Sequence, residues 1–216
     1  MEKAAGCLSV ALLGAESTGK TTLARGLAAH FEALGRRAVA VPEALRDWCE
    51  ANGRTPRPEE QQGIAQEQES RVDEACKSHD IVIADTTAVM VAIYSAILFE
   101  DASLYRFAVE HQRRYDVTLL TGLDLPWVAD GLQRDGPHVQ GPVDAQVREI
   151  LDRNGIAYRV VYGTGEERLR NALAAIDASL APRSPVRNWA WQCDKCSDPG
   201  CEHTLFRALV NPTFSP

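Results

Sequence analysis

The sequence predicts an α/β fold, in which a parallel β-sheet is covered by helices on both faces. Short apolar segments alternate with segments of helical period along most of the chain, the pattern of repeated strand–helix–strand units. Residues 81–84 form a continuous apolar run, as expected of a central strand that is buried on both faces. A glycine-rich stretch joins the first apolar segment, residues 7–13, to the first helical segment.

The individual elements follow from these periods and from the glycines and prolines between them. The expected strands are residues 7–13, 37–41, 81–84, 117–120 and 158–162. The expected helices are one from near Lys20 to just before Gly35, then residues 43–50, 59–78, 87–99, 102–114 and 143–153, and a last one carrying Leu169, Leu173, Ile176 and Leu180. Residues 124–142 are rich in proline and glycine and predict a mobile loop.

The length of the chain limits the number of domains, and its net charge limits the kinds of partner it can bind. The 216 residues suit one domain, expected over residues 1–181, with a linker and a small cysteine-rich appendage over residues 182–216. A formal net charge of −7 argues against a general nucleic-acid-binding surface. No apolar run approaches the roughly 18 residues of a membrane helix, and no targeting segment is evident. We therefore expect a cytoplasmic protein without a membrane partner.

The glycine-rich stretch matches a phosphate-binding loop, GxxxxGK followed by Ser or Thr, between an expected strand and an expected helix. Its glycines let the backbone curl so that amide groups point at phosphate oxygens, and the following helix adds its positive dipole end. Lys20 is expected to reach the β- and γ-phosphates, and Thr21 to bind Mg²⁺. The alternative is a chance glycine-rich turn. The motif predicts a P-loop NTPase fold whose ATP-binding residues are Gly14, Ala15, Glu16, Ser17, Thr18, Gly19, Lys20, Thr21 and Thr22.

An acidic residue is expected beside this loop. Asp85 ends the apolar strand 81–84, at the edge of the sheet where ligands of α/β proteins bind. Its carboxylate could hold Mg²⁺ directly or through water. The alternative is that Asp85 is a helix N-cap, a role that Thr86 or Thr87 could also fill.

A candidate general base follows the second expected strand. Glu43 lies at the same edge as the phosphate loop and could accept a proton from an acceptor hydroxyl, while Arg46 could orient Glu43 or the substrate. The alternative is an ordinary surface ion pair. In the polar helix, Gln66 and Glu67 either contact a substrate base or ribose or face solvent.

The segment 126–136 is expected to act as a lid. Trp127 could pack over a bound nucleotide, Asp130 is a candidate substrate contact, and Arg134 could neutralise charge on the transferred phosphoryl group. The alternative for Arg134 is a solvated loop charge.

Together these segments resemble the nicotinamide riboside kinase domain of the bifunctional bacterial NAD-biosynthesis regulator and related P-loop ATPases. The resemblance covers residues 7–180 and rests on the phosphate loop, on Glu43 with Arg46, on residues 83–86 (Ile-Ala-Asp-Thr) and on residues 126–132 (Pro-Trp-Val-Ala-Asp-Gly-Leu). It implies a kinase-like fold, ATP with Mg²⁺, and transfer of the γ-phosphoryl group to a ribose 5′-hydroxyl. By the same resemblance, Glu43 activates that hydroxyl and a lid arginine acts on phosphate.

The chain departs from the family pattern at two positions. Pro42 stands where the family has an aromatic residue that helps to hold the nicotinamide ring, unless Trp48 or Trp127 replaces it. Gln133 stands where the lid has its arginine, with Arg134 one place later. The adenylyltransferase and DNA-binding portions of the bifunctional protein have no counterpart in these 216 residues, so the resemblance implies the kinase step alone.

The six cysteines fall into two groups. Three of them, with a histidine, form a Cys-x2-Cys-x4-Cys-x-His cluster near the C-terminus, a complete set of ligands for a structural Zn²⁺. The alternatives are reduced thiols in a flexible tail or an iron–sulfur cluster. The cluster residues are Cys193, Cys196, Cys201 and His203. Cys7, Cys49 and Cys76 are expected to be reduced, separate, buried hydrophobic residues.

Two functions of different classes follow. The first is an ATP-dependent kinase acting on a small nucleoside-like molecule, with nicotinamide riboside as the leading candidate. Its catalytic residues would be Lys20, Glu43, Asp85 and Arg134, and its substrate contacts Glu43, Arg46, Trp127 and Asp130. The second is a regulatory ATPase or adaptor that holds a protein partner through the cysteine-rich appendage.

Overall fold

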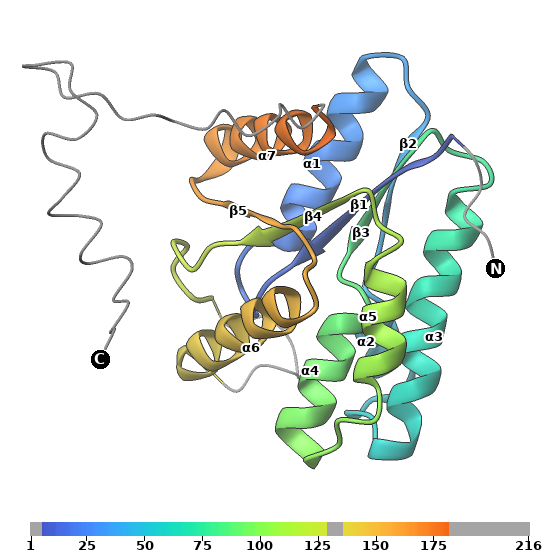
Figure 1. Ribbon diagram of the computed structural model, residues 1–216, viewed down its shortest axis with the longest axis vertical. Coiled ribbons are helices and arrows are strands. Elements are labelled where there is room, and N and C mark those ends of the chain that lie inside the picture. Colours follow the sequence, from blue (N-terminus) through green and yellow to red (C-terminus); the bar gives the residue numbers. More distant parts are fainter. Residues whose placement is uncertain (1–5, 129–135, 182–216) are drawn as a thin grey trace, which may run out of the picture. The chain divides into compact units, whose positions relative to one another are not determined.

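A five-stranded, fully parallel sheet forms the centre of the protein, with the strand order β2-β3-β1-β4-β5 (Figure 1). The computed structural model describes residues 6–128 and 136–181. The strands are β1 (Leu8–Leu13), β2 (Ala38–Val41), β3 (Ile81–Asp85), β4 (Val117–Thr121) and β5 (Arg159–Val161). β1 lies between β3 and β4, with Val10 paired to both Ile83 and Val117. The continuous apolar run of β3 is buried at every position, as expected of a strand covered on both faces.

Helices cover both faces of the sheet, which confirms the expected fold class (Figure 1). The helices are α1 (Lys20–Ala33), α2 (Ala44–Asn52), α3 (Pro58–Ala75), α4 (Ala88–Phe99), α5 (Tyr105–Gln112), η1 (Pro137–Val139), α6 (Gln140–Arg153) and α7 (Gly165–Leu180). The apolar stripes of α1 and α7 pack on one face, around Leu12 and Leu27. Residues of α2 to α6 pack on the other face, around Leu13 and Ile93.

The segment expected to be one long loop, residues 124–142, contains the start of a helix. The short helix η1 leads into α6 at Gln140, three residues before the expected start. Pro142 lies in the first turn of α6, where a missing N–H costs no intrahelical hydrogen bond. The proline therefore does not delay the start of the helix.

The expectation that Cys7 and Cys76 remain separate thiols is wrong, because the two are joined by a disulfide. They are 69 residues apart in the sequence, and their Cα atoms lie 5.5 Å apart. Cys7 directly precedes β1, and Cys76 follows α3 shortly before β3. The parallel pairing of Leu8 with Ile81 brings both cysteines to the same end of the sheet. Both side chains are buried, as expected.

The described chain up to Leu180 belongs to one compact unit, Met1–Leu180. No helix among the described residues is long and apolar enough to cross a membrane. The expected appendage, residues 182–216, lies outside the described residues, and the domain boundary near residue 181 stays a prediction.

Candidate functional site

The phosphate loop joins β1 to α1, and its conformation requires both glycines. Gly14 has φ 145° and Gly19 has φ 76°, values that other residues rarely adopt. A Cβ atom on Gly14 would lie 2.1 Å from Thr121 Oγ1, and one on Gly19 would lie 2.9 Å from Leu125 Cδ1. Ser17 also has a positive φ, 57°, without being glycine. Such strained backbone is common where a loop is shaped to bind a ligand.

Two buried hydroxyl groups support the loop from below. Thr18 Oγ1 lies 2.7 Å from Thr121 Oγ1, on the neighbouring strand β4. The carbonyl oxygens of Ala15 and Leu13 lie 2.8 Å from Thr18 Oγ1 and 3.1 Å from Thr121 Oγ1, respectively. These contacts tie the loop to the ends of β1 and β4.

Arg168, on α7, holds the loop from the other side and was not expected from the sequence. Its side chain is 5% exposed. It donates to the carbonyl oxygens of Thr18 at 2.8 Å and Gly163 at 2.9 Å, and to Asp124 Oδ1 at 2.9 Å. Burial alone would raise the pKa of the Asp124 carboxyl, but the bonds from Arg168 and from the Gly163 N–H outweigh burial and lower that pKa.

Lys20 lies across the phosphate loop. Its Nζ donates to the carbonyl oxygens of Gly14 at 2.8 Å and Ala15 at 2.7 Å. Lys20 also lines the cavity over the loop, where the motif predicts contact with the β- and γ-phosphates.

Thr21 and Asp85 lie next to each other, as two residues that bind the same Mg²⁺ ion must. Thr21 Oγ1 donates to Asp85 Oδ2 at 2.5 Å, and Asp85 Oδ1 is buried with no hydrogen-bond partner among the described residues. The alternative role of Asp85 as a helix N-cap is not observed. Thr87 caps α4, because its hydroxyl accepts from the N–H of Val89 at 3.2 Å. A hydroxyl beside an unpaired carboxylate oxygen fits the hard oxygen ligands that Mg²⁺ prefers.

A cavity of about 640 Å³ opens over the loop. Among the described residues that line it are three cations, Lys20, Arg25 and Arg46, and no carboxylate. Arg25, which lies one helical turn after Thr21, was not expected from the sequence. Such a cavity suits a polyanion of nucleotide size. The lining residues are Ser17, Thr18, Gly19, Lys20, Thr21, Thr22, Arg25, Arg46, Leu125, Pro126 and Val128.

Glu43 and Arg46 form the expected pair at the start of α2. Glu43 is the N-cap residue, and its Oε2 lies 3.5 Å from an Arg46 guanidinium nitrogen. The side chains are 17% and 39% exposed, respectively, so Glu43 is more enclosed than a typical surface carboxylate. Because Arg46 also lines the phosphate cavity, the pair links that cavity to the end of β2.

The segments on either side of residues 129–135 both contact the phosphate loop. The Val128 N–H donates to Ser17 Oγ at 2.8 Å, and Ser17 Oγ donates to the Val128 carbonyl at 3.2 Å. Gln140 Nε2 donates to the Glu16 carbonyl at 2.7 Å. Val128 and Gln140, which flank residues 129–135, are therefore both hydrogen-bonded to the phosphate loop, and the lid role of the segment stays a prediction.

Of the expected lid and Zn²⁺ residues, Trp127 is the one that the described part of the chain includes. Trp127 is partly buried near the loop, and its indole N–H has no hydrogen-bond partner among the described residues. Asp130 and Arg134 lie outside the described residues, as do Cys193, Cys196, Cys201 and His203. Within residues 6–128 and 136–181, no group of three or more His, Cys, Asp or Glu could hold a metal ion.

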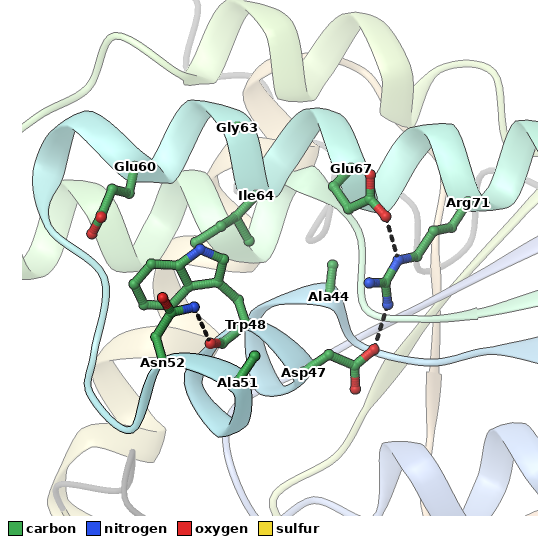
Figure 2. A pocket seen from close by; sticks show the side chains of 10 residues that line it. All are labelled: Ala44, Asp47, Trp48, Ala51, Asn52, Glu60, Gly63, Ile64, Glu67 and Arg71. Atoms are coloured by element: carbon green, nitrogen blue, oxygen red, sulfur yellow. Dashed lines mark hydrogen bonds and ion pairs between the residues drawn. The ribbon is translucent and has the colours of Figure 1, made fainter.

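A second cavity, of about 560 Å³, lies between α2 and α3 (Figure 2). Figure 2 shows Trp48 packed beside Ile64 in this groove, while Arg71 on α3 bridges Asp47 and Glu67. The groove is lined by every third or fourth residue of α2, which is the side of the helix opposite Arg46. The groove and the phosphate cavity therefore lie on different sides of α2.

Gln66 and Glu67 were expected either to contact a substrate base or ribose or to face solvent. Both side chains are exposed, which favours positions that face solvent. Their neighbours Gln68 and Glu69 are buried instead, at 1% and 5% exposure. Glu69 accepts from the Ala88 N–H at 2.8 Å and from the Tyr115 hydroxyl at 3.0 Å. Burial raises the pKa of the Glu69 carboxyl, although both hydrogen bonds oppose the shift.

The fold and the loop together define the class of protein. A parallel sheet with a phosphate loop between β1 and α1, and with an acidic residue at the end of β3, is the arrangement of a P-loop NTPase of the kinase type. The chain belongs to the family described as "AAA domain" (AAA_28), whose model matches residues 9–168. None of the curated proteins matches the sequence.

Two solved structures of NadR share the fold. The protein is similar to NadR in complex with NR, at a TM-score of 0.66 and 19% identity, over 83% of this chain and 52% of that one. It is similar to NadR in complex with NAD and AMP-PNP at a TM-score of 0.63 and 19% identity, over 83% and 51%. The chain thus spans about half the length of these NadR chains. The resemblance predicted from the motifs is confirmed for the family and the fold.

Proposed function

We propose that the protein is an ATP-dependent kinase that transfers the γ-phosphoryl group to a hydroxyl of a small nucleoside-like molecule. The observation that carries this proposal is the cavity over the phosphate loop, which is lined by Lys20, Arg25 and Arg46 and reaches Glu43 through its ion pair with Arg46. A hydrolytic ATPase needs only the nucleotide half of this arrangement. The carboxylate at the end of β2 adds a group that can receive a proton from an acceptor.

In this proposal each residue has one task. The loop amides and Lys20 hold the β- and γ-phosphates, while Arg46 neutralises charge on the transferred group. Mg²⁺, held by Thr21 and Asp85, would supply further neutralisation of the phosphates. Glu43 takes the proton from the acceptor hydroxyl. At the same time the oxygen of that hydroxyl bonds to the γ-phosphorus, and the bond between the γ-phosphorus and the β,γ-bridging oxygen of ATP breaks to release ADP.

The leading acceptor is nicotinamide riboside, at its ribose 5′-hydroxyl. The support is the similarity to NadR, which has been solved with NR, together with residues 126–128 (Pro-Trp-Val) beside the phosphate loop. Pro42 in place of the family's aromatic residue makes a wider riboside panel necessary in any assay.

The test is phosphorylation of a panel of ribosides with ATP and Mg²⁺ by the parent and by Glu43→Gln. We expect Glu43→Gln to lower the rate by a factor on the order of 10² with unchanged ATP affinity, because a general base is lost. Glu50→Gln, an exposed residue on the same helix, is the matched control and should keep the parent rate. A rate within a few-fold of the parent for Glu43→Gln would remove this residue from the proposed role.

A different outcome would favour the second function. If the parent hydrolyses ATP but phosphorylates no riboside, the protein is better described as a regulatory ATPase. Deletion of residues 182–216 would then test the appendage as a partner-binding segment, because only the adaptor function requires it. The proposed Zn²⁺ site at Cys193, Cys196, Cys201 and His203 is tested by a metal assay on the same purified protein.

A further inference from the structure

Two consecutive residues of α3 each accept a hydrogen bond from the first residue of another helix. Gln68 Oε1 accepts from the N–H of Ala44, the first residue of α2, at 2.8 Å. Glu69 Oε1 accepts from the N–H of Ala88, the first residue of α4, at 2.8 Å. Gln68 and Glu69 are only 1% and 5% exposed, so losing either acceptor would leave a buried N–H group unpaired.

Each of these two helices starts shortly after a carboxylate of the proposed kinase site. Glu43 is the N-cap residue of α2, and its side chain makes no capping hydrogen bond of its own. Asp85 is the last residue of β3, three residues before Ala88. The register pairs Val41 of β2 with Ala84 of β3, so the two carboxylates follow neighbouring strands at one edge of the sheet. The bonds from α3 therefore fix the backbone next to both carboxylates.

The turn between Asp85 and α4 needs such support because its backbone is strained. Thr86 has a φ of 90°, which is unfavourable for a β-branched residue. A strained conformation persists only where surrounding contacts impose it. Glu69 is well placed to impose it, since its second carboxylate oxygen accepts from the Tyr115 hydroxyl at 3.0 Å. The carboxylate is thus held on one side while it holds the start of α4 on the other.

We propose that Gln68 and Glu69 are positioning residues of the kinase site. Gln68 fixes the base Glu43 through the start of α2, and Glu69 fixes the turn that carries Asp85 through the start of α4. Because both residues belong to one helix, α3 also sets the separation of the two carboxylates. A displacement of about 1 Å in a reacting group can cost on the order of 10²-fold in rate. This inference rests on the proposed kinase function, because it concerns the base and the metal residue of that site.

The role of Gln68 is tested by removing the same hydrogen bond from either end. Gln68→Met removes the acceptor at similar volume. Ala44→Pro removes the donor at the first position of α2, where proline is tolerated, and Glu43 already has the extended ψ, 115°, that proline requires before it. Each variant should lower kcat for riboside phosphorylation about tenfold, with little change in KM or in the Kd of ATP. The double variant should lose little more than either single variant, because both remove one bond.

The role of Glu69 is tested through the Mg²⁺ dependence of ATP binding, which calorimetric titration measures without phosphoryl transfer. In Glu69→Met, the Mg²⁺ concentration that gives half of the full gain in ATP affinity should rise about tenfold, because Asp85 is no longer held in place. Glu69→Gln keeps an oxygen for the Ala88 N–H, and its N–H₂ group can donate to the Tyr115 hydroxyl, so it should restore the Mg²⁺ dependence of the parent.

Gln61→Met is the matched control, measured like the other variants at a temperature where circular dichroism shows a folded protein. Gln61 is another buried glutamine of α3, 2% exposed, whose Oε1 has no hydrogen-bond partner among the described residues. This variant should keep the kcat and the Mg²⁺ dependence of the parent.

The outcomes separate the two roles from each other and from the proposed function. Parent-like kcat in folded Gln68→Met and Ala44→Pro, or additive losses in the double variant, would overturn the role of Gln68. Unchanged Mg²⁺ dependence in folded Glu69→Met, or no recovery in Glu69→Gln, would overturn the role of Glu69. A parent that phosphorylates no riboside ends the proposed kinase function and the role of Gln68 with it, whereas the Mg²⁺ titration still decides the role of Glu69.

Discussion

Arg168→Met is expected to destabilise the protein and to weaken ATP binding, because Arg168 joins the phosphate loop to the segment after β4. The guanidinium donates three hydrogen bonds of 2.8–2.9 Å, to Thr18, Gly163 and Asp124, with a side chain that is 5% exposed. Hydrogen bonds that involve a charged group contribute about 1.5–3 kcal/mol each. Removing one partner of a buried ion pair costs about 3–5 kcal/mol.

The expected loss in the free energy of unfolding is about 3–4 kcal/mol. It lies in the lower part of the range for a broken buried ion pair, about 3–5 kcal/mol, because Asp124 is 29% exposed and regains water when Arg168 is removed. Methionine fills most of the vacated volume, so the contribution of a cavity is small. Freeing the Thr18 carbonyl should also loosen the loop and weaken ATP binding about tenfold, which corresponds to about 1.4 kcal/mol.

Urea unfolding followed by circular dichroism measures the first quantity, and calorimetric titration with ATP at a temperature where the variant is folded measures the second. Arg170→Met is the matched control. Arg170 lies on the same helix, is 68% exposed and is 3.8 Å from Glu166, so its loss should cost less than about 1 kcal/mol. Equal stability losses in the two variants, or unchanged ATP affinity in folded Arg168→Met, would refute the positioning role of Arg168.

Two further predictions concern parts of the fold away from the phosphate cavity. Because burial raises the pKa of Glu69, the folded protein binds this proton more tightly than the unfolded chain; stability should fall as pH rises from the unfolded pKa through the folded one. In urea unfolding between pH 4 and 8, the free energy of unfolding of Glu69→Gln should therefore increase relative to that of the parent as pH rises. A difference in stability that does not change with pH would contradict a raised pKa of Glu69. For the disulfide, whose cysteines are 69 residues apart, chain entropy predicts a contribution of about 4 kcal/mol, with measured effects of about 2–4 kcal/mol being typical. Dithiothreitol should destabilise the parent by that amount and leave Cys76→Ser unaffected, whereas equal responses would argue against the bond.

The nucleotide half of the site could be predicted residue by residue because its chemistry is local. A backbone that curls around phosphate needs glycine where φ is positive, and Gly14 and Gly19 are found with φ of 145° and 76°. Asp85 could be located because a buried strand must end at the sheet edge where ligands bind. Its hydrogen bond to Thr21 spans 64 residues, but both residues are specified by short segments around them.

The parts that could not be predicted depend on contacts between distant segments. Arg168 and Thr18 are 150 residues apart, and although helical phase places Arg168 in line with the buried Ala172 and Ile176, nothing local identifies the phosphate loop as its partner. Cys7 and Cys76 meet only because β1 pairs with β3. In each case the tertiary fold, and not local periodicity, decides the partner.

The burial of Gln68 could have been predicted from the sequence, although its unpaired side-chain group could not. It lies four residues after Ile64 and four before Val72, on the buried stripe of α3, whereas Gln66 and Glu67 lie off that stripe. Helical phase therefore places Gln68 among the buried residues of α3. Its unpaired N–H₂ group becomes evident only when the bond to Ala44 is known.

Binding of Mg²⁺·ATP to the folded protein shows whether the phosphate loop holds a nucleotide. Isothermal titration calorimetry should give saturable binding to the parent at one site per chain. Lys20→Ala should lower the affinity at least tenfold with an unchanged circular dichroism spectrum, because one ammonium group is lost from the loop. Absence of binding to well-folded parent protein, or equal affinity in the two proteins, would contradict the assignment of residues 14–22 as the ATP-binding loop.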